Sequence, residues 1–224
     1  MKISDFLQTQ SVKHSPQAMT GGMVFVNLDR PLDQAIRHAL GLSTYHPGQP
    51  SPWSHCFLLA QPYAGGSTQI LDCTIRDSNN GIIWNSSLQD DIKVLTLGME
   101  GREGGIYTGR VDDYDNAKVL NCGFYYLPSI SLTQRNQIVN AALELQSAGY
   151  KYDLPGLLRE LFRLLFGIAM KPSSHMLLFC SAFLATTYRN SLGTAWNVVP
   201  NVASVDVSPD EIWFSPPGSK EKAV

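Results

Sequence analysis

The feature that most constrains the fold is a pair of apolar runs joined by a glycine-containing turn. The first run, residues 53–60, is mainly aromatic and aliphatic, and the second, residues 69–74, follows a Tyr-Ala-Gly-Gly-Ser turn. Runs of this length on either side of a turn are typical of an antiparallel hairpin that is buried on at least one side. The sequence therefore predicts two paired strands, and with them a sheet as the centre of the fold.

Two polar side chains lie on this predicted hairpin. Because side chains alternate between the two faces of a strand, His55 shares a face with Phe57, and Asp72 shares one with Ile70. The centre of the turn brings His55 and Asp72 within about two residues of direct opposition. We therefore expect a hydrogen bond between them across the hairpin.

The other segments predict an α+β domain with a mostly antiparallel sheet packed against helices. Ser131 and Gln134 form a capping-box pattern at the start of a helix that Gly149 ends. Residues 116–126 are compatible with either a helix or a strand. The further predicted strands are 21–27, 92–97 and 105–111, and the predicted helices are 31–40, 132–148, 154–170 and 180–188, with a helical turn in 207–215.

Composition and charge narrow the classes of function. The chain has 224 residues, is 44% hydrophobic and carries a formal net charge of −2. These values suit one compact domain and give no electrostatic case for a nucleic-acid or anionic-membrane partner. We expect a loose N-terminal arm at 1–20, a central domain at 21–216 and a flexible C-terminal tail at 217–224. No stretch is apolar enough for a membrane span and no signal-peptide core is present, so we expect a cytoplasmic protein, with non-classical export left open.

The four cysteines, Cys56, Cys73, Cys122 and Cys180, are few and widely spaced. This usage predicts a reduced protein. Cys56 and Cys73 lie on the two strands of the predicted hairpin, where they either pack or pair under oxidation. None of the four belongs to a CxxC motif, so we expect neither a structural zinc site nor a cofactor.

Cys180 opens the predicted helix 180–188, and this position favours chemistry at the thiol. The positive end of the helix dipole stabilises a thiolate, and the free N–H groups of the first turn bind an oxyanion. His55 and Asp72 supply a base and an orienting acid for such a nucleophile. Each residue also has a structural explanation: a buried thiol, a core histidine and a turn-capping or Arg-paired carboxylate. His175 competes with His55 as the base because it lies close to Cys180 in sequence.

Six short motifs occur along the chain, and their order helps to indicate the fold and the function. Each motif either joins a hydrophobic strand to a polar residue or places a small or polar residue at the start of a helix. They are Gly-Gly-Met-Val-Phe-Val at 21–26, Trp-Ser-His-Cys-Phe at 53–57, Ile-Leu-Asp-Cys at 70–73, Gly-Tyr-Lys-Tyr-Asp at 149–153, Phe-Cys-Ser-Ala-Phe-Leu at 179–184 and Ser-Pro-Asp-Glu-Ile-Trp-Phe-Ser at 208–215.

This ordered set resembles the circularly permuted branch of the NlpC-type papain-fold cysteine hydrolases, the YiiX-like proteins, over roughly residues 20–216. The order of base, acid and nucleophile is the reverse of that in ordinary papain-like enzymes. The resemblance implies a permuted papain-like fold with Cys180 as nucleophile at a helix N-terminus, His55 as base and Asp72 as the third polar residue. The sequence departs from the family pattern at four positions. Cys56 and Phe57 follow the base in place of the usual small pair, Asp72 replaces the usual Glu, and Ala182 replaces the usual Glu after Cys-Ser.

The resemblance implies a cysteine peptidase or amidase, a thiol protease-like hydrolase that works through an acyl-enzyme. In this hypothesis Tyr152 and the backbone around Ser181 help to hold the oxyanion, although a structural Tyr152 is an equal alternative. The substrate is a peptide or another amide, with cell-wall peptide suggested only by the wider family. Two alternatives stay open: acyl transfer or hydrolysis on lipids or thioesters at the same site, with residues 154–170 lining an acyl channel, and a non-catalytic binding module.

Overall fold

A computed structural model of the chain describes residues 1–41, 48–77, 102–115, 117–153, 176–194, 198–199, 203–204, 207–215 and 219–222. The helices of this described part are α1 (Ile3–His14), α2 (Pro16–Met19), α3 (Pro31–Leu40), α5 (Leu132–Ser147), α7 (Cys180–Leu192) and α8 (Pro209–Phe214), with a 3₁₀ turn η1 (Val111–Asp113). The strands are β1 (Met23–Leu28), β2 (His55–Leu59), β3 (Gln69–Asp77), β4 (Arg102–Arg110), β5 (Val119–Tyr126), β6 (Lys151–Tyr152), β7 (Leu177–Leu178) and β8 (Ser219–Lys222).

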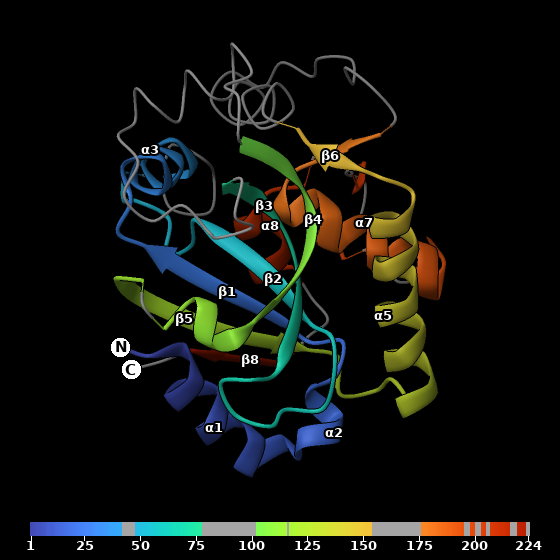
Figure 1. Cartoon of the computed structure of the whole chain (residues 1–224). Coiled ribbons are helices and arrows are strands. Elements are labelled where there is room, and N and C mark those ends of the chain that lie inside the picture. The colour runs from blue at the N-terminus through green and yellow to red at the C-terminus, as the bar shows by residue number, and fades with distance from the viewer. Residues whose placement is uncertain are drawn as a thin grey trace.

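The strands of the described residues form a single sheet in the order β7-β6-β4-β3-β2-β1-β5-β8 (Figure 1). Neighbouring strands are antiparallel except for the short parallel pair β6 and β7. The predicted α+β class and the predicted β2–β3 hairpin are therefore confirmed. The ambiguous segment 116–126 contains strand β5, which lies between β1 and the edge strand β8.

Because side chains alternate between the two faces of each strand, the buried apolar residues form two layers, one on each face of the sheet. On β2, Cys56 and Leu58 belong to the cluster that contains the buried faces of α5 and α7, whereas Phe57 and Leu59 belong to the cluster that contains α1. All four side chains are fully buried. The sheet is thus covered on both faces, which explains why its central strands are uniformly apolar instead of alternating apolar with polar residues.

Helix boundaries agree closely with the sequence patterns. The predicted capping box at the start of α5 is present, since Ser131 and Gln134 exchange hydrogen bonds with each other's backbone N–H. Helix α3 begins at Pro31 as predicted. Helix α7 extends four residues beyond the predicted end at 188 and finishes at Leu192, before Gly193. The predicted strand 92–97 and helix 154–170 lie outside the described residues.

Two expectations about the chain ends are wrong. Residues 1–20 are not a loose arm: Ile3, Phe6 and Leu7 of α1 are buried and belong to one of the two core clusters. Residues 219–222 are not a free tail, since they form the edge strand β8 beside β5. Their sequence, Ser-Lys-Glu-Lys, is charged, and charge on an edge strand hinders further strand pairing, so this charge is compatible with a strand.

No helix in the described ranges has both the length and the apolar character needed to cross a lipid bilayer.

An aromatic cluster attaches α8 to the sheet. The rings of Trp53 and Trp213 lie 4.5 Å apart between centroids, and Phe25 contacts both of them. Beneath these rings β5 carries Gly123, where an added Cβ would come within 2.6 Å of Trp213 and 2.7 Å of Trp53. The absence of a side chain at Gly123 is therefore what allows the two indoles to lie against β5.

We predict that Gly123→Ala lowers the free energy of unfolding by about 1–3 kcal/mol, because the added methyl overpacks a rigid aromatic contact. Urea unfolding followed by tryptophan fluorescence and circular dichroism measures the change. Leu120→Ala is the matched control, since Leu120 is on the same strand but 49% exposed, and we expect a change within about 0.5 kcal/mol. Equal stability of Gly123→Ala and the native protein would contradict the packing described above.

Candidate active site

The predicted hydrogen bond across the hairpin is present. The His55 Nε2 atom lies 2.8 Å from Asp72 Oδ1, and both side chains are buried. The ladder pairs Leu58 with Leu71, so His55 lies two positions along β2 from the residue opposite Asp72. That diagonal separation on one face is within reach of an imidazole and a carboxylate.

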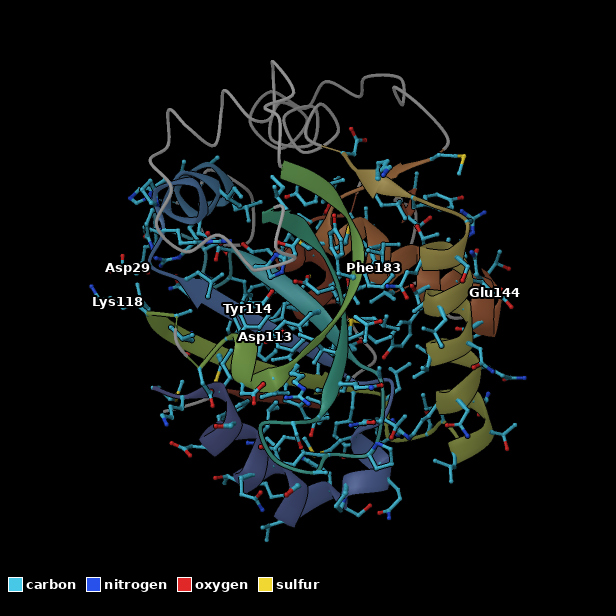
Figure 2. The ribbon with its side chains drawn as sticks, in the orientation of Figure 1. Asp29, Asp113, Tyr114, Lys118, Glu144 and Phe183 are labelled. Carbon is cyan, nitrogen blue, oxygen red and sulfur yellow. The ribbon has the colours of Figure 1, made fainter. Side chains whose placement is uncertain are left out.

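Tyr114 is the second residue that binds the carboxylate of Asp72. Its hydroxyl donates a hydrogen bond of 2.6 Å to Asp72 Oδ2, while His55 occupies Oδ1. The Tyr114 ring also stacks on Phe57, with centroids 4.7 Å apart, and lies 6.1 Å from the His55 ring at a small interplanar angle. Figure 2 shows Tyr114 over the sheet, in the segment that follows β4. No sequence motif predicts a role for Tyr114, because the residue lies outside all of the motifs described above.

Cys180 is the first residue of α7, as predicted. The preceding Phe179 has extended backbone angles and is buried, so the chain enters the helix from within the core. The first hydrogen bond of the helix runs from the Phe183 N–H to the Phe179 carbonyl. The N–H groups of the first turn therefore have no acceptor within the helix, and the positive end of the helix dipole lies at the Cys180 thiol.

The Cys180 thiol interacts with two residues of β2. Helix α7 packs against β2 and β3, and Cys56, whose side chain is on the α7 face of the sheet, belongs to the same buried cluster as Cys180 and lowers its pKa. His55 and Cys180 also act on each other's pKa through their charges. His55 begins β2 and Cys180 begins α7, so both residues lie at the ends of their elements.

These contacts favour the charged forms of both groups. The hydrogen bond from Cys56 holds the pKa of Cys180 well below its ordinary value, and the charge and hydrogen bond of His55 act in the same direction against the opposing effect of burial. Burial disfavours the imidazolium form of His55, but the charges of Asp72 and Cys180 outweigh it and raise the pKa of His55 to about 10. The two directions together favour a thiolate on Cys180 and an imidazolium on His55.

The pKa values of the other three thiols are raised instead of lowered. Burial raises the pKa of Cys56 and of Cys73 well above the ordinary thiol value, and it raises the pKa of Cys122 to about 12. All four cysteines are free, so Cys56 and Cys73 pack without pairing. The Cys73 thiol instead donates a hydrogen bond of 3.1 Å to the Leu178 carbonyl, which lies just before the Cys180 helix.

The remaining predicted site residues lie near Cys180 in different environments. Tyr152 in β6 is partly buried, and burial together with the charge of Cys180 raises its pKa well above the ordinary value, so its hydroxyl stays a donor. Ser181 is fully buried and its hydroxyl has no hydrogen-bond partner. The backbone N–H of Ser181 lies in the first turn of α7 and is a candidate donor to an oxyanion. His175, the competing base, lies outside the described residues.

One ion pair close to the site was likewise not predicted by any sequence pattern. Arg30 Nε lies 2.5 Å from Asp33 Oδ2, and both groups affect the pKa of Tyr152 through their charges. Both residues lie at the start of α3. No three histidine, cysteine or acidic side chains in the described ranges gather so that they could hold a metal ion.

Comparisons of the chain with models of known protein families, with curated proteins and with solved structures found no match. Its function is therefore inferred from the geometry of the Cys180, His55 and Asp72 side chains.

We predict that iodoacetamide at neutral pH modifies Cys180 well before the other thiols, because only the thiolate is nucleophilic and only the pKa of Cys180 is lowered. Mass-spectrometric mapping against pH should give a rate for Cys180 that is already high well below about 8.5. His55→Gln should move this profile upward by about one pH unit or more, since it removes the imidazolium. Cys122 is the internal control, and a native profile that rises only above about 8.5 would contradict the ion pair.

Proposed function

We propose that the protein is a cysteine-dependent hydrolase of amide bonds, a peptidase or amidase with a permuted papain-like fold. The observation that carries this proposal is the chain of contacts from Asp72 through His55 to Cys180, with the pKa of the thiol lowered and the pKa of the imidazole raised. Nucleophile, base and orienting acid in contact are the minimum set for acyl transfer through a thioester.

In the proposed reaction the Cys180 thiolate attacks the carbonyl carbon of the amide. The His55 imidazolium then gives its proton to the leaving nitrogen, the C–N bond breaks and an acyl-enzyme remains on Cys180. Neutral His55 next removes a proton from water, which attacks the thioester and releases the carboxylic acid and the thiolate. The same histidine thus serves as acid and then as base.

Asp72 acts as a positioning residue in this scheme. It binds His55 through Nε2, which leaves Nδ1 as the ring nitrogen available to the thiol and to the substrate nitrogen. Tyr114 holds the second carboxylate oxygen, so the carboxylate cannot rotate away from the imidazole without losing a buried hydrogen bond. Breaking such a bond costs about 1–3 kcal/mol, which supports a fixed orientation of His55.

The oxyanion of the tetrahedral intermediate would form beside the first turn of α7. The N–H groups of Cys180 and Ser181 have no acceptor within the helix, because its hydrogen bonds begin at Phe183. Donors of this kind that already point at the developing charge are worth about 2.7–4 kcal/mol each. Tyr152 is the candidate side-chain donor, because its raised pKa keeps the hydroxyl protonated.

We predict that Cys180→Ser and His55→Gln each lower turnover of peptide arylamides by at least about 10³-fold, since a nucleophile and its base act as one unit. Labelling by a peptidyl acyloxymethyl ketone should be lost in Cys180→Ser. Cys122→Ser, which changes a thiol in the other core layer, is the control and should keep native turnover and labelling.

Parallel panels of amides, acyl esters and acyl thioesters separate the candidate chemistries. Turnover of thioesters or lipid esters alone, lost in the same two variants, would replace amide hydrolysis by acyl-lipid or thioester chemistry at this site. No labelling and no turnover of any panel would leave a non-catalytic binding module.

We predict that Tyr152→Phe lowers kcat by about 10²-fold with little change in KM, because a donor to the oxyanion acts only in the transition state. Steady-state kinetics on the best substrate of the panels measures the two constants separately. Tyr150→Phe removes a hydroxyl two residues earlier and serves as the control. An unchanged kcat in Tyr152→Phe would assign Tyr152 a structural role.

A further inference from the structure

Helix α1 is joined by polar contacts to the segment that carries Tyr114. The carboxylate of Asp115 accepts a hydrogen bond of 3.0 Å from the Ser4 backbone N–H and a second bond from the Ser4 hydroxyl. Ser4 lies in the first turn of α1, and the N-cap residue Lys2 makes no side-chain cap there. The first N–H groups of a helix lack acceptors within the helix, and the positive end of its dipole favours a carboxylate. Asp115 therefore supplies a cap for α1 from a distant part of the chain.

Two further contacts hold the start of α1 in this place. The Tyr63 hydroxyl donates a hydrogen bond of 2.6 Å to the Ser4 carbonyl. The buried apolar side chains of α1 belong to the same core cluster as Val111 and Tyr114, and α1 packs against η1. The helix thus contacts the Tyr114 segment through both polar and apolar groups.

Tyr114 and Asp115 are neighbours in one tight turn and bind different partners. The Tyr114 N–H donates to the Val111 carbonyl at 3.0 Å, and the Asp115 N–H donates to the Asp112 carbonyl at 3.1 Å. From this turn the Tyr114 hydroxyl binds the carboxylate of Asp72, while the Asp115 carboxylate binds α1. A displacement of α1 therefore acts on the residue next to the one that holds the orienting carboxylate.

We propose that the docking of α1 onto Asp115 positions the His55–Asp72 pair, so that the site is oriented only while this helix is docked. Asp115 and Ser4 are positioning residues in this arrangement, because they act on His55 through other side chains. The catalytic consequence rests on the proposed function, in which His55 is the acid and base of the reaction. The orientation of the pair itself can be measured without a substrate.

The test follows the proton on His55 Nε2 by NMR in the full chain labelled with ¹⁵N-histidine at neutral pH, with the signal assigned by its loss in His55→Gln. This nitrogen lies 2.8 Å from Asp72 Oδ1, so its proton should exchange slowly with water in the native protein. Asp115→Ala and Tyr114→Phe should each speed the exchange at least about fivefold, because loss of a buried hydrogen bond favours opening of the pair by about that factor or more.

Two variants serve as matched controls. Ser11→Ala removes a hydroxyl of α1 that binds only within the helix, to the Gln8 carbonyl at 2.8 Å and the Gln8 side chain, and should leave the exchange at its native rate. Asp115→Asn keeps an acceptor for the Ser4 N–H and should restore most of the slow exchange. Native exchange in Asp115→Ala together with faster exchange in Tyr114→Phe would overturn the role of α1, and native exchange in both would overturn positioning through Tyr114 as well.

Circular dichroism identifies a variant that fails to fold. If Asp115→Ala fails, Ser4→Ala takes its place, since it removes one of the two hydrogen bonds to Asp115 and should change the exchange in the same direction. Native exchange in Ser4→Ala would then overturn the proposal.

Steady-state kinetics separate this proposal from the proposed function. On an active substrate Asp115→Ala should lower kcat several-fold with little change in KM, because it affects the orientation of the base and not the binding of the substrate. Ser11→Ala should leave both constants unchanged. A protein that turns over no substrate would overturn the proposed function, while the exchange of the His55 proton would still decide whether α1 positions the pair.

Discussion

The structure of the site depends on one buried carboxylate. Asp72 is fully buried on β3, and an unpaired carboxylate in such a place costs several kcal/mol. Its two oxygens are bound by His55 from β2 and by Tyr114 from the segment after β4. Three distant parts of the chain are thus fixed relative to one another by the need to compensate a single charge. The imidazole that results is oriented before any substrate arrives.

The charge on Asp72 also affects the ionisation of the Cys180 thiol through His55. It stabilises the imidazolium of His55, and the imidazolium in turn stabilises the thiolate of Cys180. Cys56, on the α7 face of the sheet, lowers the pKa of Cys180 in the same direction.

Local patterns predicted the parts of the site that depend on one or two neighbouring elements. The hairpin pairing follows from alternation and the glycine turn, and the position of Cys180 follows from an apolar run that begins at this residue. The role of Tyr114 depends on a contact across 42 residues, which no periodicity records. Helix α1 was missed because its buried face, which includes Ile3, Phe6 and Leu7, is too short to stand out among polar residues. The edge strand β8 was not predicted because its charged residues are also typical of a solvated chain end.

The ion pair also determines how stability depends on pH. His55 has an ordinary pKa of 6.5 and a folded value of about 10, so its contribution to stability is complete below about 6.5 and is lost as the pH rises through about 10. Cys180 has an ordinary pKa of 9.0 that folding lowers, so its contribution is complete above about 9 and is lost as the pH falls through the folded value. Between these ordinary values the two contributions run in opposite directions, because a rise in pH acts against the raised pKa of His55 and in favour of the lowered pKa of Cys180. The pH dependence that one member of the pair gives to stability is therefore opposed by that of the other.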